Sequence, residues 1–298
     1  MRTIAMVNQK GGCGKTTTAI NTAAAFATQG QRVLLVDLDP QAHATIGLGY
    51  DPDAFDRTVY DLLSGAENSL HAVVTHTQTE GLDLLPCNVL LASAELELGA
   101  VPGKELLLGR GLADARHDYD FCVIDCPPSL GILTLNALVA STDIIVPVQV
   151  HYYALEGLKR LLETIRVIRD RFHPYSMENI SLLLTFVEER RTFSRQIQQQ
   201  MREIFGDLVF DTVVHRDVRL PESPSAGESI LTYAPRSRAA ADYRALAREI
   251  TDGEAKPDEQ CDGSVIRRGI QKHLVNLFDG VWIPKGARTY RPGIIEST

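Results

Sequence analysis

A glycine-rich run near the start of the sequence has the residue types that hold phosphate groups. The run is Gln9-Lys10-Gly11-Gly12-Cys13-Gly14-Lys15-Thr16-Thr17. Its three glycines let a backbone curl around phosphate oxygens with the N–H groups pointing inward, and a helix that starts there favours negative charge. In such a loop Lys15 reaches the β- and γ-phosphates, the Thr16 hydroxyl holds Mg²⁺ and Thr17 hydrogen-bonds the α-phosphate. The run therefore predicts a site for a nucleoside triphosphate and Mg²⁺.

The loop departs from the usual pattern G-x-x-x-x-G-K-[ST]. Gln9 stands where the first glycine is expected, and a second lysine, Lys10, precedes the glycine pair. This K-G-G-x-G-K-T form resembles the deviant Walker A motif of the ParA/MinD family of ATPases. The resemblance implies that residues 10–17 bind ATP and that Lys10 crosses a homodimer interface to the partner's nucleotide. The alternative is that Lys10 serves only its own site.

Two carboxylates follow the second apolar run of the chain. The segment VDLDPQ at 36–41 places Asp37 and Asp39 on the same side of an expected strand. Carboxylates close to phosphate need a cation or a water between them and it. The longer run V-D-L-D-P-Q-A-H-A-T resembles the first switch region of ParA proteins, which implies that Asp39 orients the attacking water in catalysis with Lys10 and Lys15. Asp37 would then support Mg²⁺ or that water, although strand-end acids also serve simply as turn formers.

A third carboxylate, Asp125, closes the apolar run FCVID and precedes Cys126-Pro127-Pro128. This is the position from which a Walker B aspartate reaches Mg²⁺, usually through a water of the ion. The two prolines stiffen the next loop, which matches the second switch of the family. No arginine finger is evident, so catalysis would rest on positioning and charge. The resemblance implies slow ATP hydrolysis that a partner accelerates.

Short apolar runs that alternate with helical stretches must position these groups. The expected strands are 3–7, 32–39, 82–87, 121–126, 143–150, 180–187 and 208–214, and the expected helices are 16–29, 130–140, 154–171, 192–205 and 238–250. Such alternation predicts a doubly wound α/β fold, with a mostly parallel sheet and helices on both faces. Ligands bind such sheets at the carboxyl ends of the strands, where every motif above falls.

We expect an ATPase domain over residues 1–251, a polar linker at 252–263 and a C-terminal extension at 264–298 with one amphipathic helix. No secretory leader or membrane-spanning run is visible, which favours the cytoplasm. The five cysteines include no C-x-x-C pair, which weakens an electron-transfer alternative that would need a metal cluster. The net charge of −8 disfavours wholesale binding to nucleic acid and leaves room for a local basic face.

The segments 185–197, 213–231 and 233–250 are similar to Soj-type chromosomal ParA proteins. The resemblance implies sequence-independent DNA binding by the ATP-bound dimer through Arg191 and Arg219. Residues 188–219 contain six acids and six arginines, so any basic face must be assembled in three dimensions. Relatives usually carry proline at the position of His215, near the adenine-contacting loop. His215 would either stack on the base or leave the base to bind elsewhere.

The sequence therefore predicts a Mg-ATP-dependent switch that partitions or positions a chromosome, a plasmid or another large cargo. By resemblance its partners are a second copy of itself, nonspecific double-stranded DNA on the nucleoid and a ParB-like activator. The alternative is a MinD-like ATPase that associates with a membrane through residues 264–278, which carry Arg267, Arg268 and Lys272 on an amphipathic run. Twenty residues follow that run, whereas the MinD helix lies at the extreme end, so we favour packing on protein.

Overall fold

A computed structural model describes residues 1–67, 69–150, 154–172 and 179–253. The chain divides into two units, Met1–Lys256 and Pro257–Thr298, and all of the described residues belong to the first. Nearly all of the expected linker at 252–263, and the whole extension at 264–298, lie outside the described residues. Among the residues that are described, no helix is both long and apolar enough to cross a bilayer.

The centre of the unit is a sheet with the strand order β3-β4-β2-β5-β1-β6-β7. Every neighbouring pair is parallel except β3 and β4, so the predicted mostly parallel sheet is confirmed. The strands are β1 (Arg2–Met6), β2 (Val33–Asp37), β3 (Thr75–His76), β4 (Leu82–Leu85), β5 (Phe121–Asp125), β6 (Asp143–Gln149) and β7 (Asn179–Thr185). The register pairs Asp37 with Asp125, so two of the predicted site carboxylates end adjacent strands side by side.

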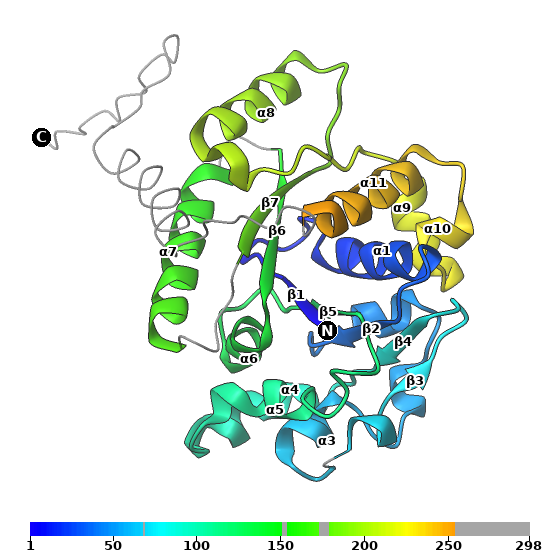
Figure 1. The fold of residues 1–298 in the computed structure, drawn as a ribbon, viewed down its shortest axis with the longest axis vertical. Helices are drawn as coiled ribbons and strands as arrows, with labels where there is room; N and C mark the ends of the chain where they lie inside the picture. Colours follow the sequence, from blue (N-terminus) through cyan, green and yellow to red (C-terminus); the bar gives the residue numbers. More distant parts are fainter. Residues whose placement is uncertain (68, 151–153, 173–178, 254–298) are drawn as a thin grey trace, which may run out of the picture. The chain divides into compact units, whose positions relative to one another are not determined.

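Helices cover both faces of the sheet, with α1 and α11 on one side and α6 on the other (Figure 1). The α-helices are α1 (Lys15–Thr28), α2 (His43–Gly47), α3 (Val59–Ser64), α4 (Leu91–Glu97), α5 (Leu107–Gly111), α6 (Ile132–Ala140), α7 (Ala154–Phe172), α8 (Thr192–Phe205), α9 (Arg219–Glu222), α10 (Ile230–Tyr233) and α11 (Arg238–Asp252). The strand and helix boundaries expected from sequence agree to within a few residues, apart from 208–214.

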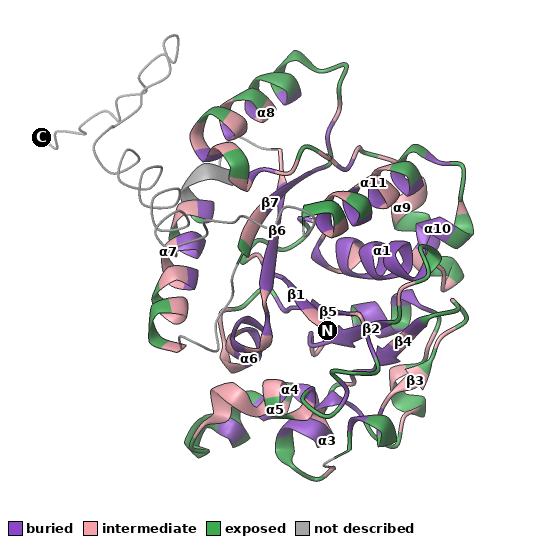
Figure 2. Ribbon diagram, viewed as in Figure 1, coloured by how far each residue is buried: buried purple, intermediate pink, exposed green. Residues whose placement is uncertain are grey.

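Small side chains explain why α1 lies so close to its neighbours. Five of its alanines are buried, and Figure 2 shows the helix almost wholly enclosed between the sheet and α11. Phe26 of α1 stacks on Phe121 of β5 with ring centroids 4.0 Å apart. Tyr243 of α11 is also fully buried, and its hydroxyl lies 3.4 Å from that of Thr18. This packing fixes the start of α1, and with it the glycine-rich loop.

The expected strand at 208–214 is wrong as a member of the sheet. The segment runs along the outer edge of β7 and makes only isolated bridges, at Val209 and His215. The reason is a competing acceptor, because the N–H groups of Asp211 and Thr212 donate to the carboxylate of Glu249 on α11 at 2.7 and 2.9 Å. In a continuous ladder every second N–H of the segment would donate to β7; those of Phe210 and Val214 do so, but that of Thr212 between them does not.

An ion pair joins β1 and β6 at the amino ends of the strands, opposite the edge where Asp37 and Asp125 lie. Asp143, at the start of β6, accepts hydrogen bonds from Arg2 at 2.7 and 2.9 Å, from the Thr142 hydroxyl at 2.7 Å and from Asn179 at 3.1 Å. Arg2 also donates to the carbonyl of Ile250 at 2.7 Å, which ties α11 to β1. Burial works to raise the pKa of Asp143, but these donors together hold that pKa below its ordinary value.

We expect Asp143→Asn to lower the free energy of unfolding by about 1–3 kcal/mol at pH 7, because the partly buried guanidinium of Arg2 loses its charged partner. The folded-state pKa of Asp143 is depressed, so its stabilisation is present above pH 4 and is lost as the pH falls through that lower value. Urea unfolding of both proteins at pH 7 and at pH 3 checks this. If Asp143→Asn lowered the free energy of unfolding by the same amount at both pH values, this prediction would be wrong.

Candidate functional site

The glycine-rich loop lies between β1 and α1, at the carboxyl edge of the sheet. Gly12 and Gly14 have φ values of +69° and +93°, in the left-handed region that favours glycine. Cys13 is buried between them, and its carbonyl accepts a hydrogen bond from the Thr185 hydroxyl of β7 at 2.9 Å. The two glycines allow the curled shape that a phosphate cradle requires, and the hydrogen bond from Thr185 helps to hold it.

The two lysines of the loop differ in their surroundings. Lys15 is only 7% exposed, and its ammonium points back across the loop to the carbonyl of Lys10 at 3.4 Å. Lys10 is exposed, and its ammonium contacts the Gln149 side chain at the end of β6 at 3.0 Å. One lysine thus faces the cradle of its own chain, and the other stands on its outer side.

The surroundings of Asp125 are those of a carboxylate that binds a cation. Its carboxylate is fully buried, and neither oxygen has a hydrogen-bond partner among the described residues. Burial, followed by the neighbouring charge of Asp37, raises its pKa well above the ordinary value, while Thr16 and Lys15 oppose the rise. A buried unpartnered carboxylate is costly unless something binds it. Asp125 with the Thr16 hydroxyl fits Mg²⁺ with its waters.

Asp37 and Asp39 are buried beside it, with different partners. Asp37 accepts hydrogen bonds from the N–H and hydroxyl of Thr45 at 2.7 and 2.8 Å and from the N–H of Asp39 at 3.2 Å. Burial raises the pKa of Asp37 to about 6. Asp37 therefore anchors the loop that leads into α2, and its predicted link to Mg²⁺ or to the attacking water stays a prediction. Asp39 accepts one bond, from the Gln41 N–H at 3.0 Å, which leaves carboxylate capacity for a water.

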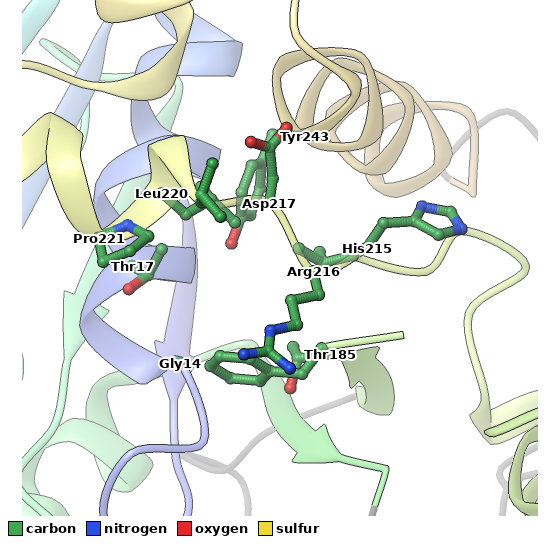
Figure 3. A pocket seen from close by; sticks show the side chains of 12 residues that line it. Gly14, Thr17, Thr185, His215, Arg216, Asp217, Leu220, Pro221 and Tyr243 are labelled. Atoms are coloured by element: carbon green, nitrogen blue, oxygen red, sulfur yellow. The ribbon is translucent and has the colours of Figure 1, made fainter. Parts of the chain in front are cut away.

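A cavity of about 300 Å³ opens beside the loop. Its lining combines residues of the loop and α1 with the end of β7 and the segment 214–221; these include Gly14, Thr17, Thr185, Phe186, Leu220 and Tyr243 (Figure 3). Phe186 has a φ of +55°, rare for a non-glycine residue, which brings it against Gly14. A mostly apolar cavity next to a phosphate cradle suits a nucleotide base.

His215 contributes to this cavity without pointing its ring into it (Figure 3). Its Nδ1 lies 2.9 Å from Asp242 and its Nε2 lies 3.1 Å from Glu189, while its backbone N–H also donates to Asp242 at 2.9 Å. This geometry does not support stacking of the imidazole on the base. A proline there would lack the N–H that binds Asp242.

The two arginines expected to bind DNA do not line the cavity beside the phosphate cradle, and each is paired. Arg191 precedes α8 and contacts Glu188 at 2.6 Å. Arg219 begins α9 and makes two bonds to Asp217, at 2.7 and 2.8 Å. Each arginine is thus held by a nearby acid in the same segment, and the role of both in DNA binding stays a prediction.

The cradle, the strand-end carboxylates and the parallel sheet define a P-loop ATPase. A family model described as an AAA domain matches residues 1–197. The sporulation initiation inhibitor protein Soj of Bacillus subtilis is 44% identical over 247 residues, 83% of this chain and 97% of Soj. The chromosome partitioning protein ParA of Caulobacter vibrioides is 40% identical over 256 residues, 85% of this chain and 95% of that protein.

A solved structure agrees with these relatives. It is that of cobyrinic acid a,c-diamide synthase from Mycobacterium smegmatis with a bound ATP analogue and magnesium, and it is 35% identical. It aligns with a TM-score of 0.73 over 87% of this chain and 98% of that one. The chain belongs to the ParA/MinD family of deviant Walker A ATPases, as a member of its ParA/Soj type. ATP and Mg²⁺ are its cofactors.

Sequence reasoning missed the walls of the base cavity. Phe186 and Tyr243 come from the end of a strand and from the middle of a distant helix, and neither belongs to the phosphate loop or to the two switch regions. Thr185 offers the only sequence signal, because it ends a strand at the edge where ligands bind in such sheets.

Proposed function

We propose that this protein is a Mg-ATP-dependent switch that dimerises around ATP, binds nonspecific DNA as a dimer and so partitions or positions a large cargo. The cargo would be a chromosome, a plasmid or another assembly carried on the nucleoid in the cytoplasm. The observation that carries the proposal is Asp125, a fully buried carboxylate without a hydrogen-bond partner in the described part of the chain, beside an intact phosphate loop. A bound Mg²⁺–nucleotide supplies the charge that this carboxylate lacks.

The lysine pair supports dimerisation. Lys15 can neutralise the charge of the nucleotide bound to its own protomer. Lys10 lies exposed on the outer rim of the loop, and among the described residues its ammonium contacts only the amide oxygen of Gln149. A cation in that position is available to a second protomer. Because the nucleotide carries several negative charges, two such cations facing each other make association depend on what is bound.

Hydrolysis would be slow. Asp39 has free carboxylate capacity for orienting a water. Its buried neighbours Asp37 and Asp125 are acceptors when ionised, so they supply no donor that would stabilise negative charge in the transition state. We propose that a ParB-like partner accelerates the step and releases the dimer. The similarity to partitioning proteins supports this type of partner.

Lys10→Ala tests the dimer. We expect the variant to keep ATP affinity within about threefold of the parent, since Lys15 holds the protomer's own phosphates, and to lose ATP-dependent dimerisation by tenfold or more. Light scattering during size exclusion with ATP, ADP and no nucleotide measures the mass, and a fluorescent ATP analogue measures the affinity. Lys104→Ala, which removes a half-buried lysine outside the loop, is the control. Full dimerisation of Lys10→Ala would mean that Lys10 serves only its own site.

A further inference from the structure

Two consecutive carboxylates after β7 hold arginines from three parts of the chain. Glu188 pairs with Arg191 at 2.6 Å through one oxygen and with Arg216 at 2.9 Å through the other. Glu189 binds Arg238, at the start of α11, with both of its oxygens. The pairs therefore gather guanidinium groups from residues 191, 216 and 238 around a single short loop.

The gathered arginines remain at the surface. The side chains of Arg191, Arg216 and Arg238 are 68%, 62% and 52% exposed, so a large polyanion can reach all three. Arg190 and Arg195, in the same loop and the first turn of α8, make no ion pair within the described residues. We call these five residues the arginine surface; they are Arg190, Arg191, Arg195, Arg216 and Arg238.

We propose that Glu188 and Glu189 restrain the arginine surface, so that one protomer binds DNA too weakly and only a dimer, with two such surfaces, binds it well. The inference rests on the proposed function, because it concerns the DNA step of that switch. It names Glu188 and Glu189 as the residues that keep the DNA affinity of one protomer low compared with that of the dimer.

Two physical effects make the arginine surface depend on dimerisation. An exposed ion pair is weak enough for a DNA phosphate to replace the carboxylate, but the displaced carboxylate stays nearby and repels the phosphate. Joining two weak surfaces in a dimer makes the second contact intramolecular and raises the overall affinity by orders of magnitude. A surface weakened by its own carboxylates therefore depends on dimerisation, whereas an unrestrained surface would bind as a monomer.

The test uses Glu188→Gln, Glu189→Gln and the double variant in the full chain, without nucleotide, at fixed salt. Each substitution keeps the side chain's shape and removes one negative charge. We expect the affinity for a short random-sequence duplex, measured by fluorescence anisotropy, to rise about 3- to 10-fold for each single variant and further for the double variant. Glu203→Gln is the matched control, because Glu203 is an exposed acid on α8 that contacts Gln199 rather than an arginine.

The outcomes separate the two proposals. If the parent shows no ATP-dependent DNA binding, the proposed function fails. If the parent does bind but the Glu188 and Glu189 variants gain no more than Glu203→Gln, the restraint is wrong and the proposed function stands. Adding Arg191→Ala to Glu188→Gln should remove most of the gain; a gain that persists in full would show that it does not pass through Arg191. Urea unfolding and ATP-dependent dimerisation of each variant confirm that the fold is kept.

Discussion

Lys15→Ala is expected to weaken ATP binding at least 100-fold, or about 2.8 kcal/mol. Lys15 is the buried cation of the phosphate loop, and its charge also works against the raised pKa of the neighbouring Asp125. Removing it leaves the phosphates of ATP facing that carboxylate without a compensating charge. Titration with a fluorescent ATP analogue in the presence of Mg²⁺ measures the loss directly.

The same variant should show no ATP-dependent dimer and no ATP-dependent DNA binding, because both steps follow nucleotide binding. Lys10→Ala provides the internal comparison, since it removes a lysine five residues earlier that is exposed rather than buried. We expect the two variants to separate, with affinity lost at Lys15 and dimerisation lost at Lys10. If Lys15→Ala bound ATP within threefold of the parent, the phosphate site would have been assigned wrongly.

Asp125→Asn is expected to have opposite effects with and without ligand. Without nucleotide, the substitution removes a buried negative charge that has no hydrogen-bond partner in the described part of the chain and lies beside Asp37. The free energy of unfolding at pH 7 should therefore rise by about 1–3 kcal/mol. With Mg²⁺ and ATP, the variant should gain little stability from the ligand, because the ion has lost its carboxylate.

The pH dependence gives an independent check on Asp125. The pKa values of Asp37 and Asp125 are raised in the folded state, to about 6 for Asp37. Between the ordinary carboxylate pKa and these raised values the folded protein binds more protons, so its stability falls as the pH rises. Asp125→Asn should flatten this fall between pH 5 and pH 7, and Asp37 should account for what remains.

Asp83→Asn is the matched control for that experiment. Asp83 lies on β4, and its carboxylate is satisfied by Tyr119 at 2.8 Å and by His76 at 2.7 Å. The same chemical change there should lower the stability at pH 7, not raise it. Thermal unfolding of both variants, with and without Mg-ATP, measures the contrast. If the ligand-free Asp125→Asn variant were less stable than the parent, the inference that the Asp125 carboxylate is destabilising until it binds a cation would be wrong.

The sequence predicted the features that depend on local chemistry. The phosphate loop has glycines where φ is positive, and continuous apolar runs mark strands that are buried on both faces. Asp37 and Asp125 end two such runs, and parallel pairing then places them side by side. These inferences succeeded because each uses residues that are close in sequence or obey one rule of sheet geometry.

Features that depend on distant partners were not predictable. The segment 208–214 has strand-like residues, yet Glu249 on α11 takes two of its N–H groups. His215 stood near the expected base site, but Asp242 and Glu189 turn its ring away. Arg191 and Arg219 were identified by resemblance, and nothing local shows that acids two or three residues away pair with them. For the segment 208–214 and for His215, a side chain from another element decides the outcome.

The proposed function requires that ATP, and not ADP, makes this protein bind DNA without regard to sequence. The most direct measurement is gel retardation of two unrelated duplexes by the intact protein with ATP, with ADP and without nucleotide, over a range of salt concentrations. We predict a shift of both duplexes only with ATP, weakening steeply as salt rises. Equal binding in all three nucleotide states, or no binding in any of them, would contradict the account.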